Sequence, residues 1–169
     1  MFRTSKGLTL IELLISILLI SVMLGAVWLI YSAGFNVFYS QVSRYDIKDQ
    51  MSLAYTTMTS ELHQATAITA ATATSITFTA DTNSDGVSET IQYTWAGTVG
   101  APLNRVVGAT TTAMVRSVQS LAFSYYNTNN ALLSIPVTLS NVRLVAVDGT
   151  AVKADETFHL RTSIYLQTI

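Results

Sequence analysis

The chain has 169 residues, a formal net charge of −1 and no cysteine. Without cysteine there is no disulfide or thiolate chemistry. Lys and Arg do not gather into the basic patch that marks nucleic-acid binding, so we expect no direct contact with nucleic acid. The length is enough for one domain of ordinary size beyond an additional N-terminal segment.

The chain opens with a short basic leader followed by a long apolar run. The leader carries Arg3 and Lys6, and the run Leu8–Tyr31 contains a single charged residue. The last 19 residues of this run would span about 28 Å as a helix, close to the hydrocarbon thickness of a bilayer. Residues 8–31 are therefore predicted to cross a membrane. Arg3 and Lys6 place the N-terminus in the cytoplasm by the positive-inside rule.

Glu12 is the one charge in this run. A charged side chain at the centre of a membrane helix costs about 2.5–3.5 kcal/mol, and less near an end, so Glu12 needs a partner. A secretory signal peptide is the alternative interpretation of the N-terminus. It would have an apolar core of about 7–15 residues and a small-residue cleavage site. The run is longer and lacks that site, which favours an anchor that is retained.

The segment KGLTLIELLIS, Lys6–Ser16, resembles the class III leader of type IV prepilins and type II secretion pseudopilins. The resemblance implies that a prepilin peptidase cuts between Gly7 and Leu8 on the cytoplasmic side and then N-methylates Leu8. Residues 1–7 would be the cleaved leader, and Glu12 would become the fifth mature residue.

Cleavage would create a partner for Glu12. The new amine and the carboxylate would lie about 6 Å apart along a helix, and an acid in the first turn complements the helix dipole. In a bundle of such helices, the amine of one chain could neutralise Glu12 of another. We therefore interpret Glu12 as an assembly salt-bridge residue.

Helical periodicity continues beyond the membrane and predicts an amphipathic helix over residues 32–67. Its apolar positions are Tyr31, Phe35, Phe38, Val42, Tyr45, Met51, Tyr55, Met58, Leu62 and Ala65. From about residue 45 this stripe is predicted to face a sheet, with Glu61 and other polar residues largely off it. Before that point no sheet covers it, so Phe35, Phe38 and Val42 are predicted to contact the helices of other subunits.

The remainder, residues 75–169, is predicted to be an antiparallel β-sheet head, which gives an α+β fold. Residues Ala65–Thr74 are expected to form the turn from helix to sheet. The pilin resemblance implies that the helix packs across one sheet. Alternating apolar residues and turn signals predict six strands: Ser75–Ala80, Thr90–Trp95, Leu103–Val107, Ser117–Tyr126, Asn141–Val147 and Thr157–Gln167.

The segment between the first two strands has two interpretations, a hairpin turn or a calcium loop. Oxygen ligands at relative positions 1, 3, 5, 7 and 9 would come from Asp81, Asn83, Asp85, the Val87 carbonyl and Glu89. The bidentate acid usual at position 12 is replaced by a neutral glutamine. Asp and Gly also favour turns for backbone reasons, so the missing acid favours the turn. No other cofactor is expected.

The sequence contains no motif of a catalytic site. The two histidines, His63 and His159, are far apart, and neither lies in a metal-binding or nucleophile motif. We therefore expect no enzymatic activity.

A second, looser resemblance concerns the strands. The segments IQYTW, LNRVV, VQSLAFSYY and NVRLVAV resemble J-type minor pseudopilins and W-type minor pilins. This implies a single-pass inner-membrane subunit with a periplasmic head, which joins other minor pilins or pseudopilins to initiate or cap a filament and lies at its tip after assembly. The alternative is a signal-anchored periplasmic binding or enzymatic domain unrelated to filaments.

Overall fold

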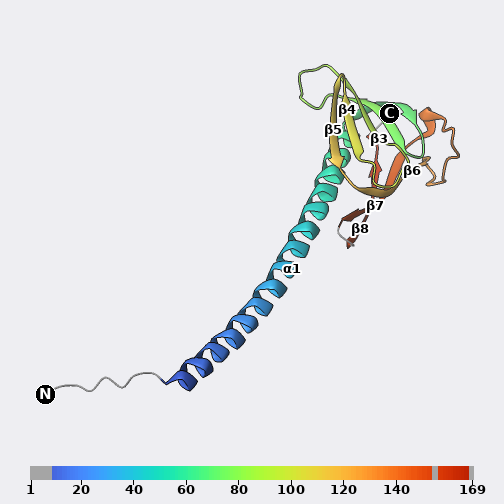
Figure 1. The fold of residues 1–169 in the computed structure, drawn as a ribbon. Helices are drawn as coiled ribbons and strands as arrows, with labels where there is room; N and C mark the ends of the chain where they lie inside the picture. Colours follow the sequence, from blue (N-terminus) through green and yellow to red (C-terminus); the bar gives the residue numbers. More distant parts are fainter. Residues whose placement is uncertain (1–8, 154–155, 168–169) are drawn as a thin grey trace. The chain divides into compact units, whose positions relative to one another are not determined.

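The structure is a computed structural model that describes residues 9–153 and 156–167; for residues 36–45 it describes the backbone alone. The chain divides into two compact units, Met1–Val42 and Ser43–Ile169. Helix α1 (Leu10–His63) contributes residues to both units. All strands belong to the second unit, in which they form two antiparallel sheets (Figure 1). The predicted α+β fold, an N-terminal apolar helix followed by an antiparallel β head, is confirmed.

The first sheet is a meander of five strands in the order β1-β2-β3-β4-β5. The second has three strands in the order β6-β7-β8, and a short 3-10 helix η1 precedes β7. The prediction of one sheet was therefore wrong. The strands are β1 (Ala65–Ala71), β2 (Ser75–Ala80), β3 (Glu89–Trp95), β4 (Leu103–Val107), β5 (Thr110–Val115), β6 (Val118–Tyr126), β7 (Leu144–Lys153) and β8 (Glu156–Tyr165), with η1 at Leu139–Asn141.

The junction between helix and sheet differs from the prediction. Helix α1 ends at His63 and not near Ala67, and the expected turn is largely the edge strand β1. Two contacts explain why these residues extend. The Thr66 hydroxyl donates to the Thr79 carbonyl on β2 at 3.1 Å, and Ile68 is buried in the core. Threonine and isoleucine suit a half-buried pleated surface.

One hydrophobic core serves both sheets and the C-terminal part of α1. The helix buries Met51, Tyr55, Met58 and Leu62, as the periodicity predicts. Facing them, the sheets bury side chains including Phe78, Tyr93, Leu103, Phe123, Tyr125, Val145 and Ile164. Full burial of such a side chain contributes about 1.5–3 kcal/mol, so this face of the helix is held firmly by the head.

The two sheets are also joined by polar contacts near the β1–β2 turn. The Phe123 amide of β6 donates to the Ala73 carbonyl at 2.8 Å. The Tyr125 hydroxyl donates to the carbonyls of Thr72 and Ser75, at 2.8 and 3.1 Å. These bonds satisfy buried polar groups where the second sheet meets the first.

Candidate functional site

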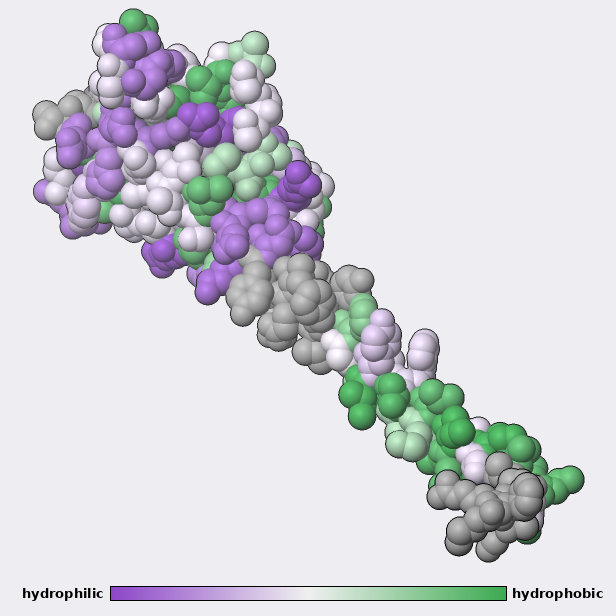
Figure 2. Space-filling view, turned by 90° about the vertical axis from the view of Figure 1, so that its left-hand side faces the viewer, coloured by the Kyte–Doolittle hydropathy of each residue, from purple (hydrophilic) through white to green (hydrophobic). Residues whose placement is uncertain are grey.

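Residues Leu10–Phe35 form the described helical segment that is long and apolar enough to cross a membrane. Its large apolar side chains are exposed in the isolated chain, Ile30 by 75%. Figure 2 shows hydrophobic residues over most of the visible face of this segment. In a bilayer this exposure has a physical reason, because lipid chains replace the missing protein neighbours.

The serine hydroxyls of this segment are satisfied within the helix. Ser16, Ser21 and Ser32 each donate to a backbone carbonyl three or four residues earlier, at 2.8, 2.8 and 3.0 Å. Lipid offers no hydrogen-bond partners, so internal pairing lowers the cost of placing these groups in a membrane. The hydroxyls therefore need no second chain.

Glu12 lies in the first turn of α1. Its amide donates to Thr9, to the carbonyl at 3.1 Å and to the hydroxyl oxygen at 3.4 Å, so Thr9 caps the helix. Thr followed three residues later by Glu is the capping-box pattern, a signal that the sequence interpretation missed. The Glu12 carboxylate has no hydrogen-bond or ion-pair partner among the residues that the structure describes.

Aromatic side chains gather at the end of the apolar segment. The ring centroids of Trp28 and Tyr31 lie 6.3 Å apart, and those of Tyr31 and Phe35 lie 4.5 Å apart. Phe35 is 43% exposed. Trp and Tyr are the residues that membrane proteins concentrate at the lipid–water interface, so this group suits the end of a membrane span.

In the head, the segment Asp81–Glu89 uses its oxygen atoms to hold its own turn. The Asp81 carboxylate accepts the amides of Asp85 and Gly86, at 3.2 and 2.9 Å. The Asp85 carboxylate accepts the Val87 amide at 2.8 Å. Gly86 has a φ of +85°, a conformation that favours glycine.

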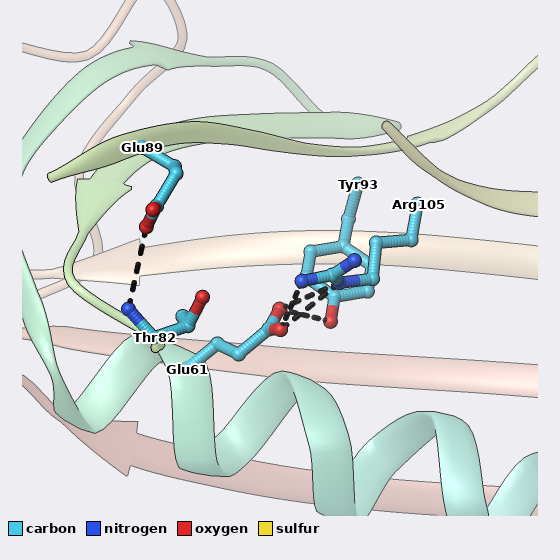
Figure 3. A network of polar contacts seen from close by, with 5 residues as sticks. All are labelled: Glu61, Thr82, Glu89, Tyr93 and Arg105. Carbon is cyan, nitrogen blue, oxygen red and sulfur yellow. Dashed lines mark hydrogen bonds and ion pairs between the residues drawn. The ribbon is translucent and has the colours of Figure 1, made fainter. Parts of the chain in front are cut away.

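The rest of this turn is closed by Glu89. Its carboxylate accepts the Asn83 side-chain amide at 3.0 Å. It also accepts the Thr82 backbone amide at 3.4 Å (Figure 3). Within the described part of the chain, His, Asp and Glu side chains form no group of three or more that could hold a metal ion. The hydrogen bonds show that these residues stabilise the turn. Calcium binding by the same residues stays a prediction.

An ionic cluster around the buried Glu61, with a partly exposed Arg105, joins the helix to the first sheet. Glu61 of α1 is 7% exposed and faces Tyr93 of β3 and Arg105 of β4 (Figure 3). The Tyr93 hydroxyl donates to Glu61 at 2.6 Å. The Arg105 Nε atom lies 3.0 Å from both carboxylate oxygens, and its Nη2 atom also bonds to Glu61.

In this cluster the protonation states of the two donors are fixed and the carboxylate oxygens are already hydrogen-bonded, as in a structural ion pair. The hydrogen bond to Glu61 raises the pKa of Arg105, so the guanidinium stays charged. Burial, and secondly Glu61, raises the pKa of Tyr93, so its hydroxyl stays protonated and donates. Both carboxylate oxygens are occupied by these donors. The cluster thus fastens helix to sheet and presents no open group for catalysis.

The sequence analysis missed this cluster because it placed Glu61 among the polar residues off the apolar stripe. A usable signal was present in Arg105. It lies in the middle of a predicted strand of apolar character, and Arg is rarely buried in such a place without a partner.

The two histidines lie on different elements, His63 in the last turn of α1 and His159 on β8. The His159 Nε2 atom lies 2.8 Å from Asp148, and both side chains are exposed.

Comparison with known protein families finds a match, and it covers the N-terminal segment of the chain. Residues 2–28 match the family model described as the prokaryotic N-terminal methylation motif. The chain carries a prepilin-type N-terminus. This motif supports the prepilin and pseudopilin family and implies a structural, membrane-anchored subunit that is processed by prepilin peptidase and assembles with other pilins. No curated protein matches the chain.

The structure places some of the predicted residues of the prepilin-type segment. Glu12 lies in the first turn, and Phe35 lies at the end of the apolar stretch. Arg3, Lys6, Gly7 and Leu8 are outside the described residues, as are the side chains of Phe38 and Val42. Cleavage after Gly7, methylation of Leu8 and the helix interface therefore stay predictions.

Proposed function

We propose that this chain is a minor pilin or pseudopilin subunit that helps to initiate or cap a type IV pilus or a type II secretion pseudopilus. The observation that carries the proposal is the methylation motif at residues 2–28 together with Glu12. This carboxylate lies in an apolar segment of membrane length, where an unpaired charge is costly. A filament of such helices supplies a partner in the terminal amine of a neighbouring chain.

In this proposal a prepilin peptidase cleaves after Gly7 and methylates the amine of Leu8. Arg3 and Lys6 keep the leader in the cytoplasm, and the head faces the periplasm. The new amine of one subunit then pairs with Glu12 of another, which sets the axial register between helices. The minor, J-type or W-type assignment is supported by the resemblance of the segments that form β3, β4, β6 and the start of β7.

Processing can be tested by mass spectrometry of protein extracted from membranes. We expect the mature chain to start at N-methyl-Leu8 and Gly7→Val to remain uncut. Gly25→Val is the matched control, because a Cβ at Gly25 meets no atom within 4 Å and this position is far from the cleavage site. The control should be processed normally. A mature chain that starts after Ala33 or later would contradict the proposal.

The role of Glu12 can be separated from helix capping. Glutamine retains the capping pattern but not the charge. We expect both Glu12→Val and Glu12→Gln to insert into the membrane with an unchanged melting temperature of the head, yet to lose incorporation into the filament-initiating complex. If Glu12→Gln assembled like the parent chain, the carboxylate charge would have no role in assembly.

The helix interface has its own test. Phe35→Glu combined with Phe38→Glu should weaken co-purification with partner pilins and spare membrane insertion, because it places charge on the stripe that faces other helices. Val99→Glu is the control, since Val99 is 72% exposed in a loop of the head. Equal recovery of partners with the double variant would move the interface to the head.

A further inference from the structure

Strand β8 is an open edge of the second sheet. All ten of its residues pair with β7, from Lys153↔Glu156 to Leu144↔Tyr165. Over residues 157–165, no backbone hydrogen bond links β8 to a described residue outside β7. An unpaired row of backbone amides and carbonyls is a ready template for another strand.

The opposite edge of the same sheet is covered by the chain itself. On β6, the Val118 and Tyr125 carbonyls accept the amides of Gly100 and Leu133, both at 2.8 Å. The Phe123 amide donates to Ala73, also at 2.8 Å. The protein thus satisfies one edge of this sheet with loops and leaves the other edge exposed over residues 157–165, although long exposed edges are usually protected.

A groove of about 600 Å³ lies between β8 and helix α1. The helix lines it with Tyr55, Thr56, Thr59 and Ser60, and the strand with Leu160, Arg161 and Thr162. Hydroxyl groups and one apolar side chain beside a strand edge suit an extended backbone with alternating side chains.

The charge of the groove lining indicates which kind of side chain a bound segment would place there. Its lining contains one cation, Arg161, and no carboxylate. Asp148 lies opposite Arg161 in the strand register, but its carboxylate bonds to His159. An acidic side chain on an incoming segment would therefore complement Arg161.

We propose that β8 and this groove bind an extended segment of a partner chain, which adds a strand to the β8 edge and places an acidic side chain beside Arg161. A second copy of β8 would bring another Arg161 to the edge, so like charges disfavour self-pairing. The proposal concerns the head and does not depend on the helix contacts of the filament.

Site-specific photo-crosslinking of the full-length chain in its native membrane tests the geometry. The probe replaces, one at a time, the outward-facing residues Thr157, His159, Ser163 and Tyr165. Mass spectrometry should find one partner segment, with the crosslinked position shifting in register as the probe moves along β8. Crosslinks to β8 of a second copy, crosslinks without register, or none at all would overturn the proposal.

Two variants test the groove and its charge. Ser60→Trp should fill the groove and abolish the crosslinks, whereas the control Ser52→Trp, exposed on the same helix, should leave them unchanged. Arg161→Glu should lower the crosslink yield about fivefold, the upper range for an exposed ion pair. In the Arg161→Glu chain, exchanging the partner's acidic residue for Lys should restore the crosslink yield. Unchanged yields with Ser60→Trp and Arg161→Glu would overturn the proposal.

The variant Glu12→Gln does not change any residue of β8 or the groove. Failure of filament assembly and failure of strand addition are therefore distinguishable.

Discussion

At the scale of single residues, Gly149 and Tyr55 show how closely helix α1 approaches β7. A Cβ atom at Gly149 would lie 2.4 Å from the Tyr55 hydroxyl oxygen and 3.2 Å from Leu121 Cδ1. Tyr55 is 3% exposed, and its hydroxyl has no hydrogen-bond partner among the described residues. Glycine is required here for space, because even a methyl group would collide with the tyrosine.

This contact predicts a coupling between two substitutions. Gly149→Ala should destabilise the head by about 1–3 kcal/mol through overpacking. Tyr55→Phe alone should be neutral or stabilising, because it removes a buried hydroxyl that lacks a partner. Combined with Gly149→Ala it should recover part of the loss, measured as the free energy of unfolding in urea. Tyr125→Phe is the control and should add to Gly149→Ala without coupling. Additive effects for Tyr55→Phe would contradict the predicted contact.

At the scale of secondary-structure elements, the Glu61 cluster fixes the position of α1 on the first sheet. Hydrophobic burial is non-directional, so it specifies the exact register of a helix less sharply than directional hydrogen bonds do. A carboxylate that bonds to neighbouring residues on β3 and β4 has one position in which its donors are satisfied. The cluster thus contributes to a single register between helix and sheet.

Removing one member of the Glu61–Arg105 pair should lower the unfolding free energy more than replacing both members by apolar residues. Arg105→Met leaves the Glu61 carboxylate buried without its cation, so unfolding free energy should fall by about 3–5 kcal/mol. Replacing Glu61 and Arg105 together by Met should recover part of this loss, because apolar residues need no ionic partner, although the Tyr93 hydroxyl then loses its acceptor. Urea denaturation of the two single variants and the double variant measures the coupling. A double variant as unstable as Arg105→Met would rule out this account.

The elements also show what a single sequence reveals. Strands such as β2 and β3 were predictable because large apolar residues alternate along them. Strands β1 (ATAITAA) and β5 (TTTAMV) were missed because small residues and threonine give almost no alternation, and pairing with β2 and β4 makes them extend. Glu61 was missed because periodicity assigns every acid to solvent. Its burial depends on Arg105, 44 residues away.

At the scale of the whole molecule, three tyrosines lie in the core that joins the helix to both sheets. Tyr55, Tyr93 and Tyr125 are each at most 3% exposed. Burial raises the pKa of all three above the ordinary value of about 10. Folding of the head therefore keeps these three hydroxyls protonated at pH values where the unfolded chain would lose the protons.

This burial predicts that the head loses stability in alkali. The tyrosines stabilise fully below about pH 10, the pKa in the unfolded chain. Above it the unfolded chain releases protons that the folded chain keeps, so unfolding free energy should fall by about 1.4 kcal/mol per pH unit for each tyrosine. Urea denaturation at several pH values above about 10 measures this dependence. The unfolding free energy should fall less steeply with pH for Tyr55→Phe than for the parent chain. An identical slope in both would contradict the assignment of Tyr55.

The strand order has a consequence for how the chain folds during synthesis. In both sheets every strand pairs with its neighbour in sequence. Each new strand therefore needs only a short loop to close before it pairs, which favours fast, local folding. A ribosome delivers the chain from the N-terminus, so the five-stranded meander can form while the last strands are still being made. Strand β8 is the last of these strands to be made, so the three-stranded sheet is completed only after the five-stranded meander has had time to form.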